Sequence, residues 1–156
     1  MMLLCYDSMI RINELLSIKT ADIDLQTKLI KVFGKRRKKR HVPFSDRTAK
    51  TIHTFLIRHR KGIPGPLLFS TKDGEKVDYR RAHRIFTDAG KKAGVYVHPN
   101  LVRHSSASQF IRMGGSPAVL QKVLGYSSLA ITQRYVHFSN DEVHEAYERY
   151  SPVPRL

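Results

Sequence analysis

Hydrophobic residues near the start of the chain recur at helical spacing. In "MIRINELLSI" they form one face and leave Arg11 and Glu14 on another. The preceding "MMLLCYDSMI" lacks a basic leader and carries Asp7, so it predicts the first turns of a buried helix rather than a signal peptide. The predicted apolar face comprises Met9, Ile12, Leu15 and Leu16.

A two-residue period follows. "LIKVFG" alternates apolar and polar residues, "KRRKK" interrupts the pattern, and "RHVPF" resumes it. The two runs predict a β-hairpin over residues 29–44, with the charged run at its tip. Ser45 and Asp46 can then cap a helix that reaches about residue 59, and its inward positions are Ile52, Phe55 and Leu56.

Capping residues mark the later helices. Asp78 can cap a helix that ends at Gly90 or Gly94, with inward positions Ala82, Ile85, Phe86 and Ala89. A helix follows Pro99, and Ser116 with Pro117 begins another.

Two more helices complete the prediction. "LAITQRYVHF" favours a short helix, and Ser139 with Glu142 forms a capping box for a final one. The elements predict a mainly α fold with a small antiparallel β-sheet near the N-terminus, in the α+β class. We expect one domain over residues 1–151 and a flexible tail at 152–156.

Composition narrows the function. The 156 residues suffice for one compact domain, and 28 Lys plus Arg against 13 acidic residues give a formal charge of +15. Such an excess usually serves a polyanion, so nucleic acid is the expected partner and no membrane association is expected. The single Cys5 excludes an internal disulfide and suits a reducing cytoplasm. Composition alone leaves a recombinase and a ribosomal protein open.

Phosphodiester cleavage requires a nucleophile, stabilisation of the non-bridging oxygens and a proton for the leaving oxygen. Arginine forks match phosphate oxygens, and a tyrosine can attack and be held as a phosphotyrosine. The chain offers Arg11, Lys35, Arg103 and Tyr135 for these tasks. No clustered Asp/Glu or Cys/His set in the sequence offers a convincing metal site, so we expect no cofactor.

Four segments give these candidates a context. The chain resembles the catalytic domain of the tyrosine recombinases, the phage integrase and XerC/XerD-like family. "IRINELLSIKTADID" is similar to the first arginine box, which implies that Arg11 is catalytic and that Glu14 supports it. "VFGKRRKKRHVPF" is similar to the family hairpin, whose catalytic lysine is then Lys35, although Lys38 remains an alternative.

The two later segments complete the resemblance. "VRHSSAS" is similar to the second arginine box and implies a role for Arg103, with His104 in support. "LGYSSLAITQRYVH" is similar to the closing segment and implies that Tyr135 is the nucleophile. The resemblance covers nearly the whole chain in the family's order, although the N-terminal DNA-gripping domain of that family is expected to be absent.

Two positions depart from the family pattern. Asn100 in "PNLVR" replaces the usual histidine, and Tyr126 replaces the usual histidine or tryptophan after Leu-Gly. Asn100 can either contact a phosphate or cap a helix, and Tyr126 can either donate to a phosphate or pack beneath the site. Proton transfer would then fall more heavily on Lys35.

The resemblance implies an enzyme that cleaves and rejoins double-stranded DNA. Tyr135 would form a 3′-phosphotyrosyl link, clamped by arginines that converge on one basic pocket, without ATP or metal. The final helix would either pack on its own core or dock into a second copy of the chain. Three alternatives are a type IB topoisomerase-like enzyme, a DNA-binding module without catalysis, and an RNA-binding protein. The expected general phosphate contacts are Arg36, Arg37, Lys38, Lys39 and Arg40.

Overall fold

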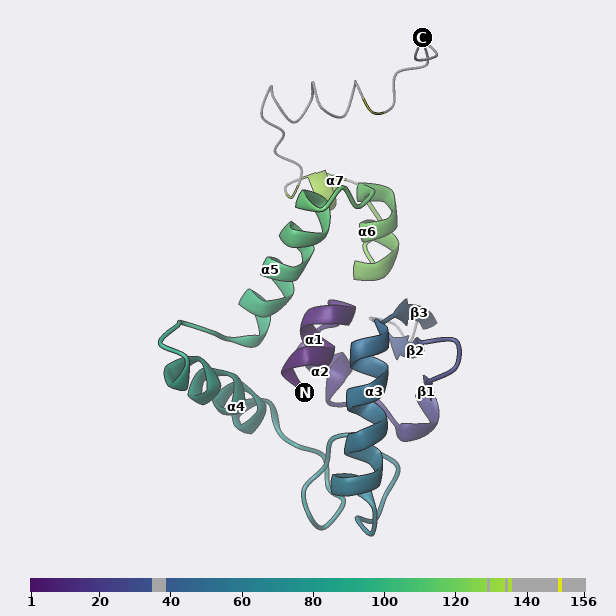
Figure 1. Ribbon diagram of the computed structural model, residues 1–156, viewed down its shortest axis with the longest axis vertical. Coiled ribbons are helices and arrows are strands. Elements are labelled where there is room, and N and C mark those ends of the chain that lie inside the picture. The colour runs from purple at the N-terminus through teal and green to yellow at the C-terminus, as the bar shows by residue number, and fades with distance from the viewer. Residues whose placement is uncertain (35–38, 129, 134, 136–148, 150–156) are drawn as a thin grey trace.

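A three-stranded antiparallel sheet lies beside the N-terminal helices (Figure 1). The computed structural model describes residues 1–34, 39–128, 130–133, 135 and 149. A short 3-10 helix, η1 (Thr20–Asp22), leads into β1 (Ile23–Asp24), which pairs with β2 (Leu29–Phe33), and β2 pairs with β3 (Lys39–Pro43). The predicted hairpin is therefore confirmed, except for its tip, which lies outside the described residues. The two-residue β1 is too short to show a period, and the sequence did not predict it.

The N-terminal helical segment is two helices rather than one. α1 (Met2–Ser8) ends at Met9, which has the left-handed φ of 52°, and α2 (Ile12–Leu15) begins two residues after Ile10. The backbone N–H of Arg11 donates to the Glu14 carboxylate at 2.9 Å, so a side chain satisfies a donor at the start of α2. The predicted apolar positions are nevertheless all buried.

The predicted helix after Ser45 is confirmed. α3 (Asp46–Phe55) begins where the Ser45 hydroxyl accepts a hydrogen bond from the Thr48 N–H, and a single π-helical turn, η3 (Leu56–Arg60), continues it. The same hydroxyl donates to the Asp7 carboxylate at 2.7 Å. The cap of α3 is thereby fixed to α1.

α4 (Tyr79–Lys92) has the predicted cap, because the Asp78 carboxylate accepts from the Arg81 N–H at 2.9 Å. Phe86 is fully buried, as predicted. Ile85 was expected to face the core as well, but it is 42% exposed. α4 packs at one side of the molecule, so the face that it buries is narrower than the hydrophobic pattern indicates (Figure 1).

The C-terminal half contains three described helices: α5 (Pro99–Arg112), α6 (Pro117–Leu124) and α7 (Ala130–Gln133). All three confirm predicted helices. Ser116 precedes α6 as expected, although its hydroxyl makes no capping hydrogen bond within the described part of the chain. Gly125 ends α6 with a φ of 72°, a conformation that favours glycine.

Two hydrophobic clusters fill the interior. The larger one joins α1, α2, the sheet, α3 and α4, and includes Ile10, Leu15, Leu68 and Phe86. The smaller one packs α5 and α6 against the end of α1, and its residues are Met9, Ala107, Ile111, Leu120, Leu124 and Tyr135.

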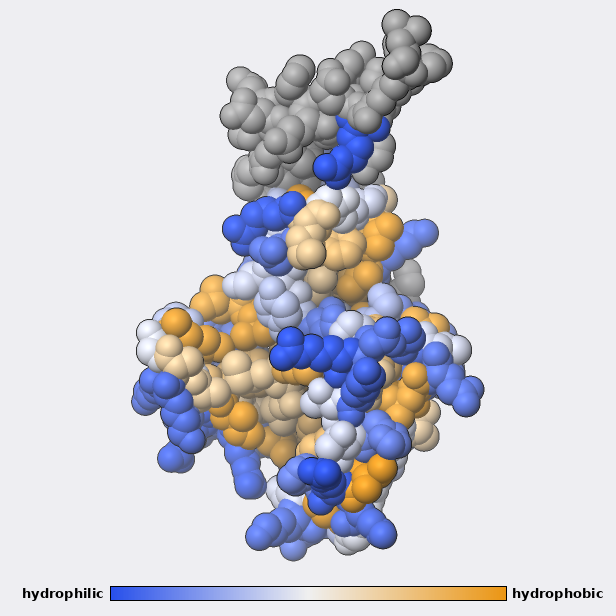
Figure 2. Space-filling view, viewed as in Figure 1, coloured by the Kyte–Doolittle hydropathy of each residue, from blue (hydrophilic) through white to orange (hydrophobic). Residues whose placement is uncertain are grey.

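The predicted final helix after Ser139 and the tail at 152–156 fall outside the described residues, apart from Arg149. Among the described helices, none combines the length and apolar character needed to span a bilayer. Figure 2 shows apolar side chains on the surface at the loop that joins α4 to α5, where Val95 is 55% exposed.

A matched pair of substitutions on α4 tests this packing. Phe86→Ala should lower the free energy of unfolding by about 3–5 kcal/mol, because it leaves a cavity in the core. Ile85→Ala should lower it by about 1 kcal/mol or less, because that side chain is largely in solvent. Urea unfolding followed by circular dichroism measures both. Equal losses in the two variants would contradict the orientation of α4.

Candidate active site

A cleft of about 1400 Å³ lies where α2, the hairpin, α5 and the turn after α6 meet. Basic and polar side chains from all four segments line it. They include Arg11, Glu14, Arg40, Asn100, Arg103, His104 and Tyr126. The cleft therefore gathers residues from both arginine boxes, the hairpin and the closing segment.

Arg103 projects from α5 and is almost fully buried. Its Nη1 donates to the Met9 carbonyl, and its Nη2 donates to the Leu124 carbonyl at 3.1 Å. Burial lowers the pKa of the Arg103 guanidinium, and a hydrogen bond with Tyr126 opposes that effect. Arginine remains protonated even so, which leaves a fixed positive charge at the cleft floor.

The ring of Tyr126 lies close to two guanidinium groups. The Arg11 Cζ is 5.4 Å from the ring centroid, and the Arg103 Cζ is 5.8 Å from it. These are cation–π distances. The two arginines therefore converge on one cleft, as the sequence predicted. Tyr126 is half-buried and lines the cleft, so it packs against the arginines and also faces the space between them.

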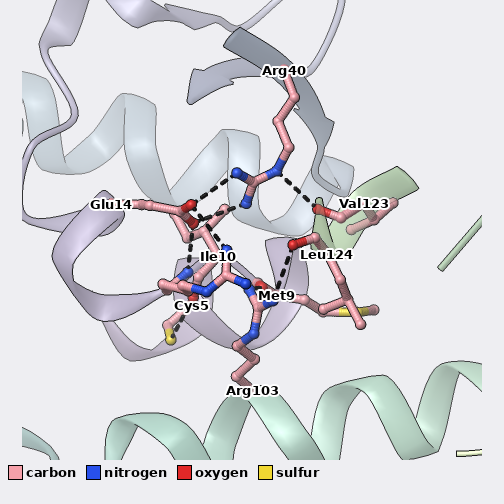
Figure 3. Close-up of polar contacts among 9 residues, drawn as sticks. Cys5, Met9, Ile10, Glu14, Arg40, Arg103, Val123 and Leu124 are labelled. Carbon is pink, nitrogen blue, oxygen red and sulfur yellow. Dashed lines mark hydrogen bonds and ion pairs between the residues drawn. The ribbon is translucent and has the colours of Figure 1, made fainter. Parts of the chain in front are cut away.

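Glu14 accepts hydrogen bonds from Arg11 and Arg40, and Figure 3 shows the pair that it forms with Arg40. Arg40 donates to both carboxylate oxygens at 2.8 Å, whereas the Arg11 Nη1 is 3.4 Å from Oε1. Burial would raise the pKa of Glu14, but the hydrogen bonds and charges of Arg40 and Arg11 outweigh it and lower that pKa. Glu14 is thus a charged support for the cleft.

Arg40 differs from its predicted role as a general phosphate contact. Its guanidinium is turned toward Glu14, and its Nε donates to the Val123 carbonyl at 3.1 Å. The sequence contained a usable signal, because Arg40 is two residues before the buried Val42 and shares its face of β3. The run of basic residues around it concealed that position.

Asn100 lines the cleft but does not cap its helix. The cap of α5 is His98, whose Nδ1 accepts a hydrogen bond from the Leu101 N–H at 3.3 Å. The alternative interpretation of Asn100 as a helix cap is therefore wrong. Asn100 is the second residue of α5 and is exposed. Its amide is left as a polar group at the cleft wall.

Tyr135 contacts His104, which lines the cleft. The Tyr135 hydroxyl is 2.9 Å from His104 Nδ1, and the two ring centroids are 5.7 Å apart. Tyr135 is 9% exposed and packs in the smaller hydrophobic cluster. Of these two described residues, His104 lines the cleft and Tyr135 does not. The hydrogen bond to His104 thus connects the phenol oxygen to a residue that lines the cleft.

The remaining predicted residues belong to the hairpin. Lys39 is exposed at the start of β3. The other candidates at the tip, Lys35, Arg36, Arg37 and Lys38, lie outside the described residues. In the part of the chain that the structure describes, no group of three or more His, Cys, Asp or Glu side chains gathers in a way that could hold a metal ion.

Comparisons with known proteins place this chain in a family. The sequence profile of the phage integrase family matches residues 1–142, so the chain belongs to that family. The tyrosine recombinase XerC of Corynebacterium glutamicum is 33% identical over 151 residues, which are 96% of this chain and 49% of the relative. The chain therefore spans about half the length of the curated relatives it matches.

Solved structures agree. The XerA recombinase has a TM-score of 0.80 and 30% identity, over 97% of this chain and 57% of that one. The XerH site-specific recombinase bound to its difH substrate has a TM-score of 0.79, over 96% of this chain and 46% of that one. At 23% identity, XerH supports the fold alone. The predicted family and the predicted α+β fold are both confirmed.

The lowered pKa of Glu14 predicts a dependence of stability on pH. The paired carboxylate stabilises the fold above its ordinary pKa of 4.5, and this contribution is lost as pH falls through the lower folded pKa. Glu14→Gln should therefore lose less thermal stability than the wild type between about pH 5 and pH 3. Melting curves followed by circular dichroism across that range measure the difference.

Asp88→Asn is the matched control, because Asp88 pairs with Arg84 at the exposed surface. Exposed pairs contribute little, so this variant should keep the wild-type dependence on pH. A Glu14→Gln protein with the wild-type slope would show that the Arg40 pair does not hold the carboxylate charged.

Proposed function

We propose that this chain is the DNA-breaking and rejoining part of a site-specific recombinase, that residues 1–151 form its catalytic domain, and that it acts on double-stranded DNA in the cytoplasm. One observation carries the proposal. Arg11 and Arg103, from segments far apart in the sequence, meet at the Tyr126 ring in one cleft, and the His104–Tyr135 pair lies at its edge. Two arginine forks and a phenol are the parts that a phosphoryl transfer without metal requires.

In the proposed reaction, Arg11 and Arg103 bind the non-bridging oxygens of the scissile phosphate. The Tyr135 oxygen attacks phosphorus, and the bond to the 5′ oxygen breaks. His104 Nδ1 is within hydrogen-bond reach of the phenol and can take its proton when the imidazole is protonated at Nε2. Lys35, assigned by the family resemblance, gives a proton to the leaving oxygen. A 3′-phosphotyrosyl link and a free 5′-hydroxyl result, and attack by a second 5′-hydroxyl rejoins the strand.

The cleft wall has fewer proton-transfer groups than the family pattern. Asn100 can donate a hydrogen bond to a phosphate oxygen, but its amide does not exchange protons near neutral pH. Tyr126 can also donate one, from between the two arginines. Electrostatic stabilisation is thus retained, while protonation of the leaving group rests on Lys35.

Asn100 also favours a second candidate function, a DNA-binding module that has lost catalysis. This module would keep the basic cleft and bind duplex DNA but would form no covalent link. A nicked suicide substrate, which traps the phosphotyrosyl product, separates the two candidates. The proposed assembly on DNA, in which the final helix docks into a second copy, applies to both.

Substitution of the two tyrosines tests the proposed roles. Tyr135→Phe keeps the ring and its packing but deletes the attacking oxygen, so covalent adducts should vanish while DNA binding stays. Tyr126→Phe should slow adduct formation by about 10²–10³-fold, because it removes one donor to the phosphate. Denaturing gels of labelled suicide DNA measure both.

The wild-type protein and its circular dichroism spectrum are the controls for this pair. Adducts that persist in Tyr135→Phe and vanish in Tyr126→Phe would reverse the two roles. A folded wild type that binds DNA and gives no adduct on any substrate would favour the non-catalytic module.

Removal of charge from the hairpin tests the DNA face. Arg36→Ala/Arg37→Ala should weaken binding to all duplex sequences alike and make the slope of log K against log salt less steep by about 2. Fluorescence anisotropy at several salt concentrations measures the slope. Arg47→Ala/Lys50→Ala removes two charges from the exposed face of α3 and should leave the slope unchanged. Equal slopes in the two double variants would count against the hairpin as a DNA contact.

A further inference from the structure

Arg40 joins three segments that are distant in the sequence (Figure 3). From β3, its Nη1 and Nη2 donate to the two oxygens of Glu14 at 2.8 Å each. Its Nε donates to the Val123 carbonyl at 3.1 Å. Its side chain is 14% exposed and that of Glu14 is 8% exposed. This is a bidentate, largely buried ion pair that also holds the end of a helix.

The Glu14 carboxylate is shared unequally between two arginines. Arg40 approaches both oxygens at 2.8 Å, whereas the Arg11 guanidinium has one contact at 3.4 Å. The Arg11 side chain is 44% exposed and lines the cleft. Because Arg40 neutralises Glu14, most of the Arg11 donors are left for an anion in the cleft. A carboxylate without Arg40 would compete for that guanidinium.

The hydrogen bond from the Arg40 Nε is made to the end of α6. Arg40 and Arg103 donate to successive carbonyls, those of Val123 and Leu124, at 3.1 Å each. These carbonyls belong to the negative end of the helix dipole, where cations are favourable. Tyr126 follows after a single glycine, so the place where α6 ends determines where its ring lies between the arginines.

We propose that Arg40 is a positioning residue of the cleft. It keeps Arg11 available to a phosphate by neutralising Glu14, and it fixes the end of α6 from which Tyr126 projects. The inference rests on the proposed function, in which the cleft binds a scissile phosphate, but its first half concerns anion binding alone. The first half can therefore be tested separately from cleavage.

A charge-rescue series tests the proposal. Arg40→Met should slow adduct formation on saturating nicked DNA by about 10-fold or more, because Arg11 is diverted to Glu14. Arg40→Met/Glu14→Gln should recover to within about 3-fold of the wild type, because the competing carboxylate is gone. Arg40→Lys should fall between them, since a point charge cannot bridge both oxygens and Val123. Arg47→Met removes an exposed charge from α3 and should match the wild type.

Inorganic sulfate supplies a readout that needs no catalysis. The sulfate-dependent rise in melting temperature that is lost in Arg11→Met is the part due to the cleft. This part should fall in Arg40→Met and return in Arg40→Met/Glu14→Gln. A role in packing alone would not be rescued, because the double variant still lacks the bond to Val123.

The outcomes are distinct. A double variant as impaired as Arg40→Met, or an Arg40→Met protein equal to the wild type, overturns the proposal. If the wild type gives no adduct, the proposed function fails, and the sulfate series still decides the role of Arg40. If Arg40→Met does not fold, the comparison rests on Arg40→Lys and on the double variant, which leaves no buried charge unpaired.

Discussion

The buried guanidinium of Arg103 is the constraint on which the cleft depends. A charge this far from water is tolerated only where acceptors surround it. One acceptor is the carbonyl of Met9, which the left-handed turn after α1 presents, and another is the carbonyl of Leu124 at the end of α6. A single side chain thus joins the N-terminal helices to the C-terminal ones. Its acceptor in the N-terminal part, Met9, is two residues before Arg11.

Local patterns in the sequence were sufficient for the hairpin and for α3 to α6, because period, caps and glycine stops are properties of the segments themselves. Tertiary contacts decided the rest. The turn at Met9 presents a carbonyl to Arg103, which is 94 residues away, and no window of the sequence contains both. Ile85 fits the helical period of α4, but its side chain is 42% exposed. His98 caps α5 although the capping preference favoured Asn100.

The sequence allowed candidate site residues to be named, but it did not predict how their side chains are arranged. The order of the boxes named Arg11, Arg103 and Tyr135 as candidates, yet it gave no sign that one phenol ring would lie close to both arginines. That contact orients two like charges toward a common point before any ligand arrives. Preorganised charge of this kind does not have to be rearranged during a reaction. It therefore stabilises a charged transition state better than water does.

Gly125 restricts how this sequence can vary. Its φ of 72° already disfavours a side chain, and a Cβ built there would lie 3.0 Å from the Arg40 Nε. The two restrictions are independent, because only the second depends on Arg40. A lineage that replaced Arg40 with a smaller residue would open space beside Gly125 but would still require the left-handed backbone. The left-handed backbone therefore favours glycine at position 125 whatever residue occupies position 40, and Arg40 adds a close contact for any side chain placed there.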